Sequence, residues 1–577
     1  MAAEDSCGIL SSLSNKSSDH EFYTPVPKGY EPGKTKYLVI TGSVISGVGK
    51  GIFSSSMGAL LEAAGLKVEP IKFDGYLNQD AGTLNPYRHG EVFVLDDGAE
   101  TDMDLGAYER FLDKNLSKLN YITGGKIFNT VLTKERKGEY LGRDVQFIPH
   151  VTGEIKAFVR ECAITTKTDV VIIEVGGTVG DLENGYFMEA MRQLQYEEGR
   201  SNVIFSNVTY AFNPSSLGEF KSKPAQSGIR TLMSLGIQPE IVVVRAGREV
   251  GEKVREKISI YSNVPLERVV CVPDAQSIYE VPIMLHEKGL DKAVLELLGI
   301  KRAPAVRTEA AMRRWEDFCE ALAKPTKSIK IGITGKYTEV KDSYASIIQA
   351  IEHSRAKAGC KVELVWIETS KLTPKSTDAE VAKVLDGVNG IIVPGGFGSR
   401  GTEGKIKCIE YARKNKLPYL GLCYGMQMAV VEFCRNVLGL SKANSTEIDP
   451  DTPDMVIDIL PEQKKIEGLG GNMRLGGKDV ELVKGSMAAE LYGKLKIRER
   501  FRHRYEVNPD YIDRIQKAGM VFSGKAPNQP IMQVMEIPSH PFFVGTQFHP
   551  ELSSRPFNPN PLFLGFVKAC LEQSKKA

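Results

Sequence analysis

Short, almost purely apolar runs recur along the chain, and each is followed by a stretch with helical spacing. In the first half these runs lie at 37–42, 170–177, 202–210 and 240–246. Such runs are typical of central parallel strands that helices cover on both faces of a sheet. The alternation of strand and helix therefore predicts a doubly wound α/β domain with a parallel sheet.

A second alternating set begins at residue 329, with apolar runs at 329–337, 361–368, 390–398 and 417–427. The segment between the two sets carries prolines and a charged helix, which is typical of a linker. The sequence therefore predicts a polar, disordered tail over 1–35, an α/β domain over 36–300, a linker over 301–327 and a second α/β domain over 328–577.

Composition argues against several classes of function. The net charge is only +2 at pH 7, so no basic field favours nucleic-acid binding. No apolar run approaches the roughly 20 residues that a membrane span needs, and the polar tail has no apolar segment of a secretory signal. The nine cysteines form no C-x-x-C pair, which argues against zinc and disulfides and for a reducing compartment. We therefore expect a cytoplasmic protein without nucleic-acid or membrane partners.

One cysteine stands where a nucleophile can be activated. Cys423 follows an apolar run and precedes an expected helix that begins near Gly425. A sharp strand-to-helix turn lifts a side chain out of the sheet, and the helix N-terminus favours a thiolate and an oxyanion. Alone, such a cysteine is more often a small buried core residue.

Two further stretches strengthen the catalytic interpretation. His549 and Glu551 are two residues apart, so on an extended segment both side chains point to one face. Glu551 could then orient His549, which could deprotonate Cys423. Residues 394–398 (PGGFG) supply backbone amides suited to an oxyanion hole. Together these elements predict a Cys-His-Glu acyl-transfer site.

A glycine-rich loop after the first expected strand has the parts of a phosphate site. The loop fails the pattern G-x-x-x-x-G-K-[ST], because Val44 stands at the first glycine and Gly51 follows Lys50. It nevertheless offers a strand end, close-approach glycines, a lysine and the amides of the next helix. We therefore predict phosphate binding, with a plain glycine-rich turn as the alternative.

Carboxylates beyond this loop favour a nucleotide triphosphate. Glu174 ends an apolar run, where a charged residue is difficult to explain as structure, and Asp104 ends an acidic cluster. Asp104 and Glu174 together suit a Mg²⁺ ion beside a triphosphate. Lys72 and Asp74 follow another strand, and a second triphosphate would suit the group Lys221, Lys223 and Gln226.

The second half resembles the class I glutamine amidotransferases through PGGFGSRGTEG (394–404), GLCYGMQ (421–427) and TQFHPE (546–551). The resemblance covers roughly 328–572 and implies that glutamine is hydrolysed to deliver ammonia to a partner domain. It implies that the amides of Gly396 and Tyr424 form the oxyanion hole and that Gln427, Glu447 and Arg504 hold glutamine. By charge, Glu447 suits an α-ammonium and Arg504 an α-carboxylate.

Nearly the whole chain resembles the CTP synthase family. The matching stretches are GKG (49–51), HGEVFVLDDGAETDMDLGAYERFL (89–112), EVGGTVGDLE (174–183), KSKPAQ (221–226), REKISIYSNVP (255–265) and SIYEVP (277–282). The resemblance implies that ATP phosphorylates O4 of UTP, and that ammonia travelling through an internal channel displaces the phosphate to give CTP. It also implies activation by GTP, inhibition by CTP, dimers and homotetramers, and the filaments known in the family.

The family's nucleotide residues carry over to matching positions. For ATP these are Gly47, Val48, Gly49, Lys50, Gly51, Ile52, Lys72, Asp104 and Asp274, with Asp104 and Glu174 as metal ligands. For UTP they are Ser46, Lys221, Lys223, Gln226 and Lys257, and the inhibitor CTP would add Asp181, Leu182 and Glu183 to this set.

Three positions depart from the family pattern. Tyr424 replaces a usual leucine but would still contribute its backbone amide. Gly47 replaces a common serine and keeps the amide, whereas Gly75 replaces a usual proline and could loosen the loop that carries Asp74.

Two other functions remain as alternatives. The first domain could activate another acceptor, as in GMP or cobyrinate amidation, although the lysine pair and the acidic stretch argue against this. Alternatively, it could be a regulatory ATPase with a vestigial thiol domain. The presence of Cys423, His549 and Glu551 argues against that interpretation.

Overall fold

The apolar runs of the first half pair into one parallel sheet in the computed structural model, which describes residues 23–214, 219–301, 305–335, 341–459 and 473–575. The strand order is β5-β2-β6-β1-β7-β8-β9, and every pair is parallel. The strands are β1 (Lys36–Gly42), β2 (Val68–Asp74), β5 (Tyr121–Thr123), β6 (Val170–Val175), β7 (Val203–Tyr210), β8 (Ile241–Ala246) and β9 (Val269–Pro273).

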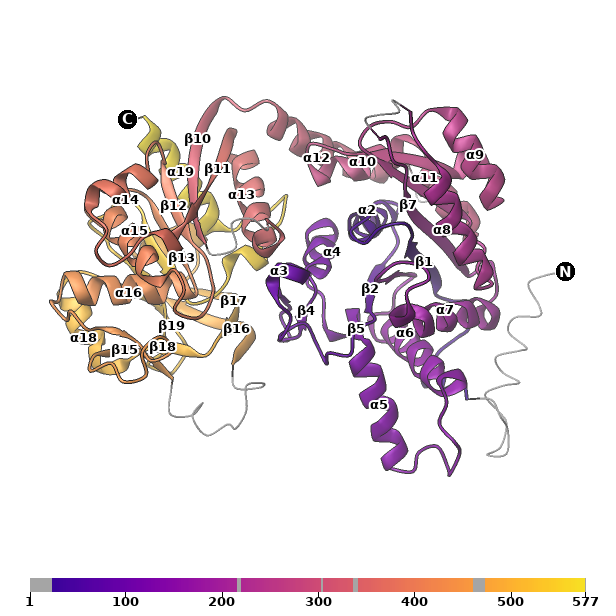
Figure 1. Ribbon diagram of the computed structural model, residues 1–577, viewed down its shortest axis with the longest axis horizontal. Coiled ribbons are helices and arrows are strands. Elements are labelled where there is room, and N and C mark those ends of the chain that lie inside the picture. The colour runs from indigo at the N-terminus through magenta and orange to yellow at the C-terminus, as the bar shows by residue number, and fades with distance from the viewer. Residues whose placement is uncertain (1–22, 215–218, 302–304, 336–340, 460–472, 576–577) are drawn as a thin grey trace. The chain divides into compact units, whose positions relative to one another are not determined.

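Helices cover both faces of this sheet (Figure 1). On β6, Ile173 packs in a core with α6 and α7, whereas Ile172 lies beside α2 on the other face. The helices are α2 (Lys50–Ala63), α4 (Asp104–Leu112), α5 (Gly124–Arg136), α6 (Thr152–Thr166), α7 (Gly185–Glu198), α8 (Lys223–Ser234), α9 (Glu252–Ser262), α10 (Val281–Glu287), α11 (Leu290–Leu297) and α12 (Ala305–Ala323). The doubly wound α/β fold predicted for this half is confirmed.

The second half is built on a nine-stranded sheet of order β11-β10-β12-β13-β21-β20-β19-β16-β17. Strands β11 to β21 in this order are parallel, and the remaining pairs are antiparallel. The bounds are β10 (Lys327–Gly335), β11 (Cys360–Glu368), β12 (Gly390–Val393), β13 (Tyr419–Leu422), β16 (Arg474–Leu482), β17 (Lys496–His503), β19 (Val521–Lys525), β20 (Met532–Glu536) and β21 (Phe543–Thr546). The sequence predicts the parallel strands but not the antiparallel extension.

Two small sheets and a further set of helices complete the strands and α-helices of the described residues. The small sheets contain β14 (Asn444–Ser445), β15 (Met455–Ile459) and β18 (Tyr505–Val507), and β3 (Phe93–Val94) with β4 (Glu100–Thr101). The helices are α3 (Pro86–His89), α13 (Ala345–Ala358), α14 (Asp378–Val384), α15 (Thr402–Lys414), α16 (Tyr424–Asn436), α17 (Met487–Tyr492), α18 (Pro509–Lys517) and α19 (Pro561–Ser574). Among the described residues, no helix is long and apolar enough to cross a membrane.

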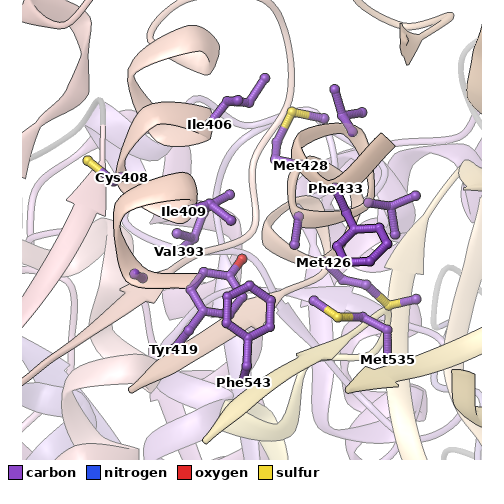
Figure 2. Close-up of a cluster of buried hydrophobic side chains, with 14 of the residues drawn as sticks. Val393, Ile406, Cys408, Ile409, Tyr419, Met426, Met428, Phe433, Met535 and Phe543 are labelled. Carbon is purple, nitrogen blue, oxygen red and sulfur yellow. The ribbon is translucent and has the colours of Figure 1, made fainter. Parts of the chain in front are cut away.

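A hydrophobic core lies between α15, α16 and the parallel strands (Figure 2). The rings of Tyr419 on β13 and Phe543 on β21 stack with centroids 4.3 Å apart. Met426 of α16 and Met535 of β20 pack in the same core. This packing fixes the end of β13, where Cys423 begins the next turn.

The chain divides into two compact units, and the division is not simply sequential. One unit contains residues up to 83 and 104–319, and the other contains 84–103 and 320 onward. Segment 84–103, which is predicted to belong to the first domain, therefore groups with the second unit. The Arg498 guanidinium donates to both carboxylate oxygens of Asp96, and Arg502 Nε donates to Glu100 Oε1 at 2.6 Å.

The predicted disordered tail is wrong for residues 23–35. Tyr23 donates a hydrogen bond of 2.5 Å to Glu154, and the guanidinium of buried Arg160 lies over the Tyr30 ring at 5.4 Å. The Tyr30 hydroxyl lies 2.7 Å from that of Tyr37. These aromatic contacts offset the cost of ordering a polar segment. Residues 1–22 of the predicted tail lie outside the described residues.

Glu499 on β17 makes the stability of the second unit depend on pH. It is buried and accepts from Tyr492, Ser553 and Asn560 at 2.6–3.1 Å. Burial raises its pKa from about 4.5 to about 7. The folded state therefore favours the protonated form, and its stability falls as pH rises from about 4.5 to about 7.

We expect Glu499→Gln to flatten this pH dependence by up to about 3 kcal/mol, because the amide stays neutral. Urea unfolding at pH 5 and pH 8 measures the difference. Glu363→Gln, at an exposed position of β11, is the matched control and should leave the pH dependence unchanged. An equal pH dependence in Glu499→Gln and the unmodified protein would contradict the assignment.

Candidate active sites

The loop between β1 and α2 has the backbone of a phosphate-binding loop. Val44, Gly47 and Gly49 have φ values of 80°, 70° and 95°. Val44 stands where the usual pattern has its first glycine, and it adopts the left-handed conformation that a glycine adopts readily. A β-branched residue rarely does so, and such strain is concentrated at functional sites. Gly49 is the N-cap of α2, so the amides of that helix begin at Lys50.

Lys50 is buried at the start of α2. Its Nζ donates to the carbonyl of Gly177 at 2.7 Å, and its side chain packs against Gly42. Burial lowers its pKa, an effect that the Glu174 carboxylate opposes. A cation held in this way can approach a phosphate after giving up one carbonyl contact.

Three carboxylates surround the Lys72 ammonium. Lys72 Nζ contacts Asp104 Oδ2, lies 3.1 Å from Glu174 Oε1 and lies 3.8 Å from Asp74 Oδ1. Burial raises the pKa of Glu174 and of Asp74, and Lys72 opposes both shifts. The structure thus brings together the four residues of this cluster that were singled out from the sequence.

Asp104 occupies the space that the unusual loop sequence leaves open. A Cβ at Gly51 would overlap the Oδ1 of Asp104, so only glycine allows this approach. A serine or threonine at this position would hold a metal in the usual loop. Here a carboxylate from α4 reaches the same place.

Two carboxylates that share one ammonium fit a divalent cation bound jointly with phosphates, because Mg²⁺ usually takes one or two protein carboxylates. Among the described residues, no group of three or more His, Cys, Asp or Glu side chains is arranged to hold a metal by itself. The donor set therefore fits an ion whose other ligands come from substrate and water.

The loop after β6 is tied to the phosphate loop. Val179 N donates to the Gly42 carbonyl at 2.8 Å. Asp181 accepts from Thr178 N at 2.7 Å, and both Leu182 and Glu183 are exposed. A Cβ at Gly75 would meet the Glu183 carbonyl at 2.6 Å, so this backbone approach requires the glycine that departs from the family pattern.

Four of the five residues predicted for UTP lie on or near α8 and α9. Gln226 is buried on α8 and donates to Ser222 Oγ at 2.9 Å, whereas Lys221 pairs with Glu219. Lys223 Nζ lies 5.7 Å from the centre of the Tyr261 ring on α9. Lys257 is exposed on α9, and Ser46 is exposed in the phosphate loop.

Asp274 lies just after β9. Its Oδ1 accepts from Arg245 at 2.7 Å, and the Arg245 side chain lies beside Gly49. The predicted adenine-side residue is thus linked through one arginine to the phosphate loop.

In the second unit, Cys423 forms a strained turn between β13 and α16. Its φ of 49° and ψ of −99° are unusual for a non-glycine residue. A Cβ at Gly425 would overlap the Val393 carbonyl, so close packing against β12 requires this glycine. The thiol contacts the Arg502 carbonyl at 3.7 Å and accepts from Gln547 Nε2 at 3.5 Å.

His549 is held in place by Glu551 beside the Cys423 turn. Its Nδ1 lies 2.7 Å from Glu551 Oε1. Burial by itself lowers the pKa of His549, but the Glu551 carboxylate and the Cys423 thiol outweigh burial and raise this pKa well above its usual value. A Cβ at Gly395 would meet the imidazole at 2.8 Å and Cys423 Cβ at 3.8 Å, so Gly395 lies against both side chains.

The predicted glutamine residues gather around this turn. Gln427 donates to the Tyr505 carbonyl at 2.9 Å, next to Arg504, and Glu447 accepts from Gly398 N at 3.0 Å. Gly396 lies in the exposed loop after β12, and Tyr424 N begins α16.

Known families match both halves of the chain. The family described as "CTP synthase N-terminus" matches residues 36–300, and the class-I glutamine amidotransferase family matches 339–569. A CTP synthase from Thermococcus gammatolerans is 50% identical over 540 residues, which cover 93% of this chain and 99% of the relative. One from Thermus thermophilus is 47% identical over 95% of this chain and 98% of the relative. The chain belongs to the CTP synthase family.

A solved structure described as the Trypanosoma brucei CTPS glutaminase domain with bound acivicin is 37% identical, covering 42% of this chain and 94% of that one, with a TM-score of 0.40. Membership of the CTP synthase family makes the chain a glutamine-hydrolysing ligase of pyrimidine biosynthesis that converts UTP to CTP. It decides against the GMP, cobyrinate and regulatory-ATPase alternatives.

Several side chains at these sites were not predicted from the sequence. Tyr108 and Ser54 both donate to Glu174 Oε2. Tyr108 lies four residues after Asp104, and Ser54 lies four residues after Lys50. Helical spacing therefore offered a sequence signal for both side chains. Gln547, which donates to the Cys423 thiol, lies within the TQFHPE stretch, two residues before His549.

For this CTP synthase family member, Gly51→Ser should reduce CTP formation at least about 100-fold with either ammonia or glutamine, because the new side chain displaces Asp104 and misplaces a charge in the site. Absorbance at the UTP-to-CTP difference wavelength measures the rate. Gly251→Ser, at the N-cap of α9, is the control, because a Cβ there meets open space and its φ of −63° suits any residue. Near-normal synthesis by Gly51→Ser would show that Asp104 does not need this position.

Proposed function

We propose that the chain makes CTP through a UTP intermediate phosphorylated on O4, with ammonia generated at Cys423 and channelled to it. One observation carries the proposal: a single chain holds both a lysine-carboxylate cluster beside a phosphate loop and a Cys-His-Glu group at a strained strand-to-helix turn. The first suits phosphoryl transfer, and the second suits amide hydrolysis.

In the glutaminase reaction, His549 takes the thiol proton and Cys423 Sγ attacks the side-chain carbonyl carbon of glutamine. The amides of Gly396 and Tyr424 stabilise the oxyanion, and His549 returns the proton to the departing ammonia. Glu551 stabilises the imidazolium, in agreement with the raised pKa of His549. Water then releases glutamate from the thioester.

Gln427, Glu447 and Arg504 would position glutamine in this reaction. Glu447 supplies a negative charge for the α-ammonium, and Arg504 supplies a planar donor for the α-carboxylate.

In the synthetase reaction, Lys50 and Lys72 stabilise charge on the γ-phosphate as it moves from ATP to O4 of UTP. Asp104 and Glu174 would hold Mg²⁺, which supplies positive charge to the phosphates when bound. Ammonia then attacks C4 of UTP, and phosphate leaves with its O4 oxygen. Charged side chains at the carboxyl edge of the first sheet support this assignment.

The remaining nucleotide residues keep the roles that the family suggests. The loop Ser46, Gly47, Val48, Gly49, Gly51 and Ile52 would hold phosphates, and Asp274 would lie near the adenine. The set Ser46, Lys221, Lys223, Gln226 and Lys257 would hold UTP, and CTP would use the same set with Asp181, Leu182 and Glu183. We also propose activation by GTP, a cytoplasmic location, and dimers, homotetramers and filaments.

Cys423→Ala should abolish glutamine-supported CTP formation while ammonia-supported synthesis continues at close to the normal rate. Incubation with UTP, ATP and Mg²⁺ and either nitrogen source measures both rates from the absorbance change. Loss of the ammonia-supported reaction as well would contradict the division of chemistry between two sites.

Lys50→Ala gives the reciprocal test. Because Lys50 neutralises phosphate charge, its loss should reduce synthesis from both nitrogen sources by at least about 1,000-fold and leave basal glutaminase activity. Glutamate release is measured beside CTP formation. Retained synthesis would exclude the phosphate role of Lys50.

A further inference from the structure

The backbone of Gly398 is held on both sides of its Cα. Its N–H donates to Glu447 Oε1 at 3.0 Å. Its carbonyl lies 3.0 Å from the Tyr424 hydroxyl and 3.1 Å from Thr402 Oγ1. The two hydroxyls lie 2.6 Å from each other. Because each hydroxyl carries one proton, two of these three oxygen–oxygen contacts can be hydrogen bonds at once.

Gly398 ends the loop that carries the oxyanion donor. Gly396 lies two residues earlier and is exposed, and as a glycine it has no side chain to pack against its surroundings. By contrast, Tyr424 is 2% exposed, and Lys405 Nζ lies over its ring at 4.9 Å. A leucine, the usual family residue here, could fill the space but could not donate to the loop.

We propose that the Tyr424 hydroxyl, with Thr402, positions the oxyanion loop through the Gly398 carbonyl and links it to Glu447. Tyr424 then contributes twice: its amide stabilises the oxyanion, and its side chain holds the second donor, Gly396, in place. Glu447 connects the same residue, Gly398, to the glutamine α-ammonium. This inference rests on the proposed glutaminase reaction.

In this arrangement Glu447 binds both Gly398 N and the α-ammonium of glutamine. When the α-ammonium of glutamine approaches, the Glu447 carboxylate, which has several acceptor positions, can bind it while still accepting from Gly398 N. The Glu447 carboxylate that binds glutamine thus also orients the oxyanion loop.

Tyr424→Phe removes only the hydroxyl and keeps the amide. We expect this variant to lower glutaminase kcat about 10-fold with little change in KM. The double variant Tyr424→Phe, Thr402→Val should lower kcat about 100-fold, which is the usual effect of losing one oxyanion donor. Glutamate release gives both constants. Alkylation of Cys423 by iodoacetamide forms no oxyanion intermediate, so its rate should stay within about twofold of normal.

The controls separate positioning from unfolding and from failure of the proposed function. Tyr411→Phe, on the same helix as Thr402, should leave kcat unchanged, and ammonia-supported CTP synthesis should remain normal in every variant. Normal kcat in the double variant, or an equal loss of kcat and alkylation rate, would overturn the positioning role. Absence of glutamine hydrolysis in the unmodified protein would instead overturn the proposed function.

Discussion

The first unit depends on a buried ammonium that three carboxylates share. Lys72 lies between Asp74, Asp104 and Glu174, which come from two strand ends and the start of α4. Removing the Lys72 ammonium would leave these buried carboxylates uncompensated, which is strongly destabilising. The cluster therefore fixes α4 against the sheet, and it also places the carboxylates beside the phosphate loop. In this unit, the contacts that fix α4 against the sheet also form the site.

The second unit has a different constraint, the backbone strain at Cys423. Its left-handed conformation persists because α16 is packed tightly against β12 and β13 through Gly425 and the core shown in Figure 2. The surrounding core thus offsets the cost of a nucleophile that projects from the sheet. His549 and the loop after β12 are then placed by neighbouring strands of one rigid sheet.

Local patterns predicted the parallel strands, the Cys423 turn, the His549–Glu551 pair and the pairing of Asp104 with Glu174, but not that Lys72 lies between these carboxylates. Each depends on residues close in sequence or on the rule that parallel strands end at one edge. Periodicity does not encode long-range pairing. The antiparallel strands β16, β17, β19 and β20 depend on such pairing, and so does the ordered structure of residues 23–35. The same holds for the Tyr424 hydroxyl, since its partner Gly398 lies 26 residues away. The nucleotide and glutamine contacts remain predictions.

The grouping of segment 84–103 has a consequence for how the enzyme can be divided. Its ends at Thr83 and Asp104 belong to the first unit, whereas Asp96 and Glu100 pair with arginines of β17. The covalent chain therefore passes between the units three times. A glutaminase fragment that begins at residue 328 would lack one piece of its own structure and would leave Arg498 and Arg502 without these carboxylates. The modules are distinct in chemistry but interleaved in sequence, so a cut at the linker cannot separate them cleanly.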